Sequence, residues 1–218
     1  MQVLVTGGTG FIGAELCREL DERGHDVTAL SRSPEDVALP QDVETVEGDV
    51  TEYDSIVDAF EGQDAVYNLV ALSPLYKTKG DLTHERVHLG GTEHAVRAAE
   101  DADVTRFVQM SALDADPDAP TAYLRAKGEA ESVVRESDLD WTIFRPSVVF
   151  GEGGEFIPFT KKLTTPYVTA LPGGGKTRFQ PIHRDDMVEI LAEGIDDEHV
   201  GETYEIGGPE MLTLAAGT

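Results

Sequence analysis

A glycine-rich turn near the start of the chain limits the possible fold more than any other sequence feature. The apolar residues 3–5 lead into Gly7-x-x-Gly10-x-x-Gly13, and a segment with helical apolar spacing follows at once. In a strand–turn–helix unit, one glycine makes the tight turn, one lets the backbone approach a pyrophosphate, and one lets helix and strand pack closely. The helix then directs its first N–H groups at the phosphates. The segment therefore predicts a dinucleotide-binding turn rather than an ordinary tight turn.

Strand and helix patterns alternate through the rest of the chain, with helical periodicity clearest over residues 82–99 and 121–135. After the first strand, the patterns predict strands over 27–30, 43–46, 65–71, 106–111, 141–145 and 203–206. Such alternation requires right-handed crossovers and a parallel sheet covered on both faces, with the ligand at the carboxyl ends of the strands. We therefore expect an α/β protein with a Rossmann-type doubly wound parallel sheet.

The regular alternation stops at residues 151–154, which read GEGG. We expect residues 1–150 to form the NAD(P)-binding Rossmann domain. Residues 151–218 are expected to form a small substrate-side lobe together with the last strand of the sheet, packed on the same domain.

The chain is strongly acidic, with 42 Asp and Glu against 17 Lys and Arg and a net charge of −25. This balance argues against nucleic-acid binding, which needs a basic face. No apolar run approaches the roughly 20 residues of a membrane span. The lone cysteine, Cys17, excludes an internal disulfide and is expected to serve packing. We expect a cytoplasmic protein. Its many acidic residues resemble the surface of halophilic proteins, and the alternative is an acidic surface unrelated to a high-salt habitat.

The charge also predicts how stability depends on salt. Carboxylates spread along the chain repel one another, and at 1 M salt the Debye length is only ~3 Å, so this repulsion is largely screened. We expect the melting temperature to rise from low salt to molar KCl, measured by calorimetry or circular dichroism. A flat or falling trend would remove the halophile interpretation.

Three residues in the second half of the chain indicate proton-transfer chemistry. Ser111 ends a predicted strand, and Tyr123 and Lys127 lie four residues apart on a predicted helix, so they share a face. A nearby ammonium lowers the pKa of a phenol, which lets a tyrosine act as acid or base nearer neutral pH. Ser111 could hydrogen-bond a substrate carbonyl. The three side chains are therefore the candidate catalytic set.

With these residues in view, nearly the whole chain resembles the short-chain dehydrogenase/reductase superfamily in its extended and atypical branches. The segments that carry the resemblance are TGGTGFIG (6–13), GDV (48–50), NLVA (68–71), Ser111, the Tyr123/Lys127 pair, RPSVVFG (145–151) and QPIHRDDM (180–187). The phrases SALDADPDAPTAYLRAKGEAE and YEIGGPEMLT are similar to one atypical group. That group contains the NADP(H)-binding accessory subunit of mitochondrial complex I and proteins predicted to be nucleotide-sugar epimerases.

The resemblance implies a strand order of 3-2-1-4-5-6-7. It implies an NAD(P)-dependent oxidoreductase or epimerase-like enzyme that transfers hydride to or from a carbonyl or carbinol compound. It also implies a cofactor path, in which Lys127 grips the nicotinamide ribose beside Tyr123. The pyrophosphate and ribose would be contacted by Gly7, Thr9, Gly10, Phe11 and Ile12, and the adenine by Asp49 and Val50. Ala71 would line the ribose path, and the segment from Pro146 to Val149 would border the carboxamide. For single residues a structural role is the alternative: Asp49 could cap a turn and Val149 could belong to the core.

The end of the second predicted strand bears on the choice of cofactor. An acid there would bond the ribose 2′-hydroxyl of NAD, whereas an arginine accommodates the 2′-phosphate of NADP. The strand runs into Ser31-Arg32-Ser33, with no acid before Glu35. Because the forked guanidinium of Arg32 suits phosphate, NADP(H) is favoured over NAD(H), with a plain surface role for Arg32 as the alternative.

One position departs from the pattern of extended members, which carry asparagine in a phrase like N-V-x-G-T. This chain reads VHLGGT over 87–92, so His88 takes that place. The asparagine of the family helps to hold a water relay behind the lysine, so its replacement puts turnover in question. The alternative function is therefore a non-catalytic NADP(H)-binding subunit or redox sensor, with a second copy of the chain or a respiratory complex as partner.

Two further motifs are interpreted as chance matches. Residues 84–88 read HERVH and fit the HExxH pattern of zinc proteases, but no third ligand follows at a familiar spacing, so we expect no metal. Residues 173–177 read GGGKT and resemble the end of a phosphate-binding loop for nucleoside triphosphates, but Pro181 interrupts any following helix. We expect a turn that borders the substrate lobe.

Overall fold

The computed structural model describes residues 1–76, 80–163 and 178–213. Seven strands form the main sheet: β1 (Gln2–Thr6), β2 (Asp26–Ser31), β3 (Glu44–Glu47), β4 (Ala65–Asn68), β5 (Arg106–Met110), β6 (Asp140–Pro146) and β10 (Glu202–Ile206). Every pairing between them is parallel, in the order β3-β2-β1-β4-β5-β6-β10. This Rossmann-type order confirms the predicted fold class and the predicted sequence of strands.

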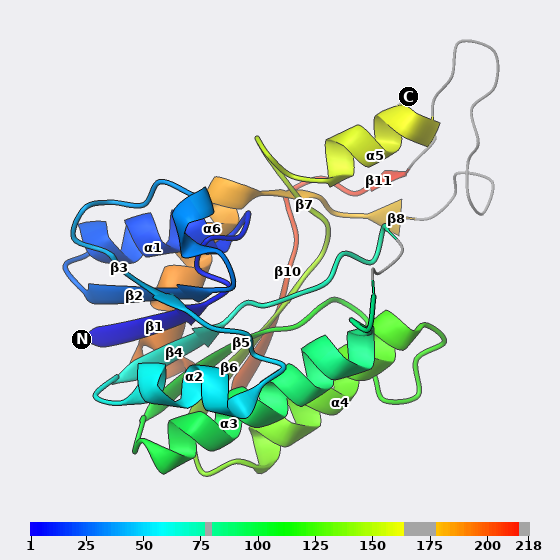
Figure 1. Ribbon diagram of the computed structural model, residues 1–218. Coiled ribbons are helices and arrows are strands. Elements are labelled where there is room, and N and C mark those ends of the chain that lie inside the picture. The colour runs from blue at the N-terminus through cyan, green and yellow to red at the C-terminus, as the bar shows by residue number, and fades with distance from the viewer. Residues whose placement is uncertain (77–79, 164–177, 214–218) are drawn as a thin grey trace.

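Helices cover both faces of the sheet (Figure 1). The α-helices are α1 (Gly13–Glu22), α2 (Tyr53–Ile56), α3 (Gly91–Asp101), α4 (Ala122–Glu136), α5 (Phe156–Leu163) and α6 (Arg184–Ala192). A π-helix, η3 (Glu85–Gly90), leads directly into α3. Short 3₁₀ turns are η1 (Pro34–Asp36), η2 (Val57–Phe60), η5 (Glu193–Ile195) and η6 (Asp197–His199).

Two apolar clusters form the core, one on each face of the sheet. Residues of α1 and α6 make the first, in which Leu16, Cys17 and Met187 are fully buried. Residues of α2, α3 and α4 make the second, around Phe60 and Phe107. Burial raises the pKa of the Cys17 thiol to about 12, so the cysteine serves packing, as predicted. The helix at 184–192 therefore belongs to the layer that covers the sheet beside α1.

A buried polar cluster joins the carboxyl ends of three neighbouring strands. The Asn68 amide accepts from Thr6 Oγ1 at 2.7 Å and donates to Gln109 Oε1 at 2.9 Å and to Thr92 Oγ1 at 3.1 Å. After Asn68 the chain leaves the sheet, so β4 is three residues shorter than the predicted strand 65–71. Residues 69–71 therefore follow β4 as a loop at the carboxyl ends of the strands.

The predicted helices lie close to their predicted bounds. Thr121 is the N-cap of α4 and its hydroxyl accepts from the Leu124 N–H at 3.3 Å, so α4 begins where the pattern indicates. The segment predicted over 82–99 begins three residues later, as η3, and continues through α3.

The remaining elements lie beyond the main sheet. β7 (Val149–Phe150) pairs with β9 (Ile182–His183), and β8 (Arg178–Phe179) pairs with β11 (Leu212–Thr213). α5 and β8 lie together away from the sheet (Figure 1). The division at residue 150 stays a prediction, and the GGGKT segment at 173–177 lies outside the described residues. Within the described part of the chain, no helix is long and apolar enough to cross a membrane.

Candidate functional site

A cavity of about 1200 Å³ opens at the carboxyl ends of the strands. Every residue that the sequence assigned to the cofactor or to catalysis lines it: Gly7, Thr9, Gly10, Phe11, Ile12, Arg32, Asp49, Val50, Ala71, Ser111, Tyr123, Lys127, Pro146 and Val149. The structure thus brings together residues from the whole length of the fold. Their individual roles stay predictions.

The glycine turn has the geometry that its three glycines predict. Gly7 has a φ of +74°, a conformation that favours glycine, and its N–H donates to the Leu30 carbonyl at 2.8 Å. The Gly10 N–H donates to the Gly7 carbonyl at 2.9 Å. A Cβ on Gly13 would lie 2.1 Å from the Gly7 oxygen, so only glycine lets α1 start this close to the turn. A ligand can therefore approach the backbone directly here.

Phe11 connects this turn to the segment that follows β7. The guanidinium of Arg184 lies 5.3 Å from the centre of the Phe11 ring and 3.2 Å from Glu15 on α1. A Cβ on Gly154 would lie 2.9 Å from the Phe11 ring. The loop at 151–154 therefore rests on the ring at the mouth of the cavity.

The far end of the cavity lies beside the end of β2. Arg32 is exposed there, and among the described residues no carboxylate pairs with it. Asp49 reaches the same wall, but its Oδ1 accepts from the N–H and the hydroxyl of Thr51, both at 2.9 Å. Asp49 therefore caps a turn, the alternative that the sequence left open, while it also borders the cavity.

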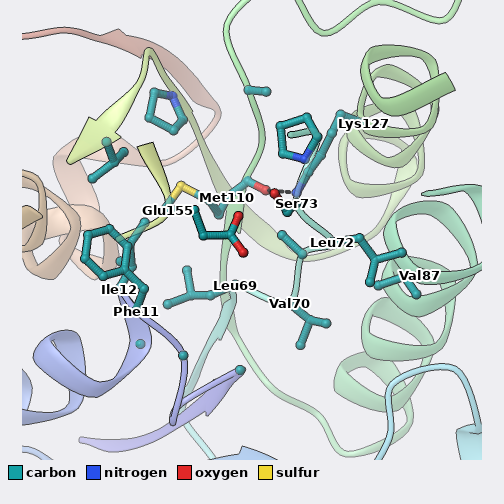
Figure 2. A pocket seen from close by; sticks show the side chains of 18 of the residues that line it. Phe11, Ile12, Leu69, Val70, Leu72, Ser73, Val87, Met110, Lys127 and Glu155 are labelled. Carbon is teal, nitrogen blue, oxygen red and sulfur yellow. Dashed lines mark hydrogen bonds between the residues drawn. The ribbon is translucent and has the colours of Figure 1, made fainter. Parts of the chain in front are cut away.

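Lys127 lies deep in the opposite wall (Figure 2). The side chain is 2% exposed, and its Nζ donates to the Met110 carbonyl at 2.8 Å. Burial lowers the pKa of Lys127 to about 8, although the charge of Glu131 opposes this shift. The lysine therefore changes its charge close to neutral pH.

Tyr123 lies one helical turn before Lys127 and packs against two histidine rings. The centroids of His84 and His88 lie 5.5 and 5.3 Å from that of Tyr123, both in edge-to-face geometry. Burial raises the pKa of Tyr123 to about 12. The predicted lowering of this pKa by the lysine is therefore wrong for this structure, because the Lys127 ammonium is turned to the Met110 carbonyl. The phenol is neutral and carries its proton.

His88 lies behind the cavity wall on the π-helix η3, an irregular element of a kind that occurs frequently at functional sites. It is 1% exposed, and its Nε2 accepts from the Leu72 N–H at 2.8 Å. Burial, with Lys127 nearby, lowers the pKa of His88 to about 2, so the ring is neutral. The histidine that replaces the family's asparagine therefore holds the cavity wall at Leu72. Among the described residues, no group of three potential ligands completes a metal site around His84 and His88.

Ser111 is 2% exposed, and its hydroxyl donates to the buried carboxylate of Glu131. Sequence reasoning missed Glu131, although its position four residues after Lys127 could have drawn attention to it. The predicted bond from Ser111 to a substrate carbonyl is untested, but this proton already has an acceptor inside the protein.

The wall beyond Tyr123 was also missed by the sequence analysis. It is largely apolar and includes Leu72, Pro74, Leu75, Leu82, Leu113, Phe156 and Phe179. Glu155 directs its carboxylate into the cavity (Figure 2), and Arg178 and Ser73 also line it. These residues come from loops, from short strands and from the start of α5, and their positions carry no periodic sequence signal.

Residues 7–198 match the model of the family described as NAD(P)H-binding. The chain belongs to this family. Its resemblance to the extended short-chain dehydrogenase/reductase group is thereby confirmed, and relatives in two functional classes agree with it. The chain is 30% identical to the complex I alpha subcomplex subunit 9 of Arabidopsis thaliana, over 96% of the chain and 54% of that protein. It is 37% identical to a 3-beta-hydroxysteroid dehydrogenase of Mycolicibacterium neoaurum, over 98% of the chain and 67% of that protein.

Similarity to solved structures extends over the described fold. A double mutant of the dTDP-glucose 4,6-dehydratase of Streptomyces venezuelae, solved with NAD, matches with a TM-score of 0.79 at 23% identity. The match covers 99% of this chain and 78% of that protein's chain. At this identity the likeness shows the fold alone. The chain spans about half the length of the plant complex I subunit that it matches.

Proposed function

We propose that the protein is an NADP(H)-dependent oxidoreductase that interconverts a carbonyl and a carbinol compound, with Tyr123 as the proton donor and acceptor. The observation that carries the proposal is one cavity wall that presents the Tyr123 phenol and the buried Lys127 opposite the glycine turn. Family membership supports the cofactor class, and the steroid dehydrogenase relative supports the reaction class.

The residues present fit a dinucleotide. A side chain at Gly7 or Gly13 would meet backbone at 3.2 and 2.1 Å, so the turn leaves its backbone bare where a pyrophosphate would lie. Lys127 would hold the nicotinamide ribose, and Pro146 and Val149 would border the carboxamide. When bound, the nicotinamide supplies or accepts the hydride. The protein's own task is to bind, to orient and to move the proton.

The neutral, protonated form of Tyr123 favours the reaction in the direction of carbonyl reduction. A neutral phenol can donate its proton to an oxygen that is gaining negative charge. The ring contacts with His84 and His88 hold the phenol in place without taking its proton, because both histidine pKa values are lowered by burial. Tyr123 would accept the proton in the reverse direction.

The apolar wall favours an apolar carbonyl compound over a nucleotide sugar. A sugar ring needs several hydrogen-bonding partners, whereas a mostly hydrophobic pocket places few polar groups. Of the hydroxyls that line the cavity, Ser111 already donates its proton to Glu131, so it has none to offer a sugar. A quinone, alkyl ketone or steroid ketone therefore suits the described wall better than a sugar does.

Cofactor preference is tested by removing Arg32. Charge-assisted hydrogen bonds contribute about 1.5–3 kcal/mol, so Arg32→Ala should weaken NADPH binding by about 10- to 100-fold and leave NADH binding nearly unchanged. Fluorescence titration at matched high salt measures both affinities. Arg97→Ala removes an exposed arginine on α3 that does not line the cavity, and it serves as the matched control. Equal wild-type affinities for NADPH and NADH would refute the assignment of the 2′-phosphate to Arg32.

A second candidate is a non-catalytic NADP(H)-holding subunit or sensor, in a respiratory complex or as a homo-oligomer. The complex I relative favours it, as do the engaged Ser111 and the histidine at position 88. Both candidates predict tight cofactor binding. They differ in whether the Tyr123 hydroxyl affects turnover.

A further inference from the structure

Four hydrogen bonds from three side chains converge on the buried carboxylate of Glu131. Arg145 donates through Nε to Oε1 at 2.8 Å and through Nη2 to Oε2 at 2.6 Å. Arg135 donates to Oε2 at 2.9 Å, and the Ser111 hydroxyl donates to Oε1. Glu131 is 1% exposed. A buried carboxylate is costly unless it is paired and hydrogen-bonded, and here both oxygens are satisfied.

The same contacts attach α4 to the end of β5 at two successive points. Met110 and Ser111 are consecutive residues, and Lys127 and Glu131 are one helical turn apart. The Met110 carbonyl accepts from Lys127, and the Ser111 hydroxyl donates to Glu131. These two links fix the helical face that carries Tyr123 against the sheet.

Glu131 lies one helical turn after Lys127 on α4, and its negative charge raises the pKa of that lysine. The other titratable groups around the lysine are His84, which precedes η3, His88 on η3 and Tyr123 on α4, all neutral at neutral pH. Arg145 on β6 and Arg135 on α4 face Glu131 and partly offset its charge. The carboxylate therefore stabilises the ammonium form of Lys127.

We propose that Glu131 is a positioning residue of this site: it takes the Ser111 hydroxyl proton, so that Ser111 is held away from the substrate and α4 is held against the end of β5, and it favours the charged form of Lys127 one helical turn away. Proton transfer is then left to Tyr123 without help from the Ser111 hydroxyl. The part that concerns turnover rests on the proposed function, whereas the charge of Lys127 can be measured without substrate or cofactor.

The test follows Lys127 directly by NMR of the full chain labelled with ¹³C at the lysine ε-carbon. The chain has six lysines, and Lys127→Met identifies the signal. Glu131→Gln keeps the shape and an acceptor for Ser111 but removes the charge, so the titration midpoint of Lys127 should fall by about one pH unit or more. Ser111→Ala should leave the midpoint nearly in place. An unchanged midpoint in Glu131→Gln would overturn the proposal.

A second variant covers the case in which Glu131→Gln does not fold. Arg135 is 36% exposed, and Arg135→Ala removes one cation that offsets the carboxylate, so the Lys127 midpoint should rise. An unchanged or lowered midpoint in this variant contradicts the proposal. For turnover, removal of a donor to a developing oxyanion costs about 10²–10³-fold. A loss of that size in Ser111→Ala, with the Lys127 midpoint unchanged, would return Ser111 to the substrate and refute this part of the inference.

Discussion

Replacement of Tyr123 by phenylalanine should reduce turnover by about 10²–10⁴-fold and leave NADPH affinity nearly intact, because general acid–base catalysis has that typical magnitude. The ring still fills its place against His84 and His88, so only the hydroxyl is lost. Turnover is measured as NADPH oxidation with apolar ketones, quinones, aldehydes and nucleotide sugars. Affinity is measured by fluorescence titration at the same salt concentration.

Tyr53→Phe is the matched control. Its hydroxyl is bonded to Asp101 at 2.6 Å on the surface at α2, and its side chain does not line the cavity. If Tyr123→Phe turns over any substrate at the wild-type rate, the phenol is not the proton donor, and the non-catalytic binding function becomes the better proposal. A loss of NADPH binding in Tyr123→Phe would instead show that the hydroxyl holds the cofactor.

The sequence predicted the sheet well because its signals are local. The glycine turn between β1 and α1 and the apolar runs of β2, β5 and β6 lie within short windows, and parallel order follows from alternation. The same locality placed Tyr123 and Lys127 on one face of α4. The sequence also predicted which residues gather at the cavity, since most of the cofactor-side residues lie at or just after strand ends, whereas their individual roles stay predictions.

The contacts that define the chemistry of the site are not local, and the sequence could not supply them. The Lys127 ammonium bonds to a backbone carbonyl on β5, a group that every residue carries, so no pattern marks Met110 as its partner. The partner of Ser111 lies 20 residues away on α4, and it is held by Arg145 from β6. The expected lowering of the Tyr123 pKa failed for the same reason, since spacing alone does not show where an ammonium points.

The buried Lys127 should also make stability depend on pH in a way that a single substitution can reveal. The pKa of Lys127 is about 8 in the folded protein, against 10.5 for an unperturbed lysine, so between these pH values the unfolded chain binds a proton that the folded chain has lost. Stability from this group therefore rises as pH increases from about 8 to above 10.5. A shift of about 2.5 units corresponds to ~3 kcal/mol, because each unit is worth ~1.4 kcal/mol.

Lys127→Met lacks the titrating group. The free energy of unfolding of the wild type, relative to that of the variant, should therefore increase by about 3 kcal/mol between pH 7 and pH 11. Urea unfolding of both proteins, at one fixed high salt concentration, measures the difference and cancels the titration of all other groups. Lys161→Met, at an exposed lysine on α5, is the control and should run parallel to the wild type. Parallel curves for Lys127→Met as well would mean that the ammonium is solvated or paired in the folded protein. The pKa of Lys127 would then lie near the ordinary lysine value, and burial would add no cost to its charged form.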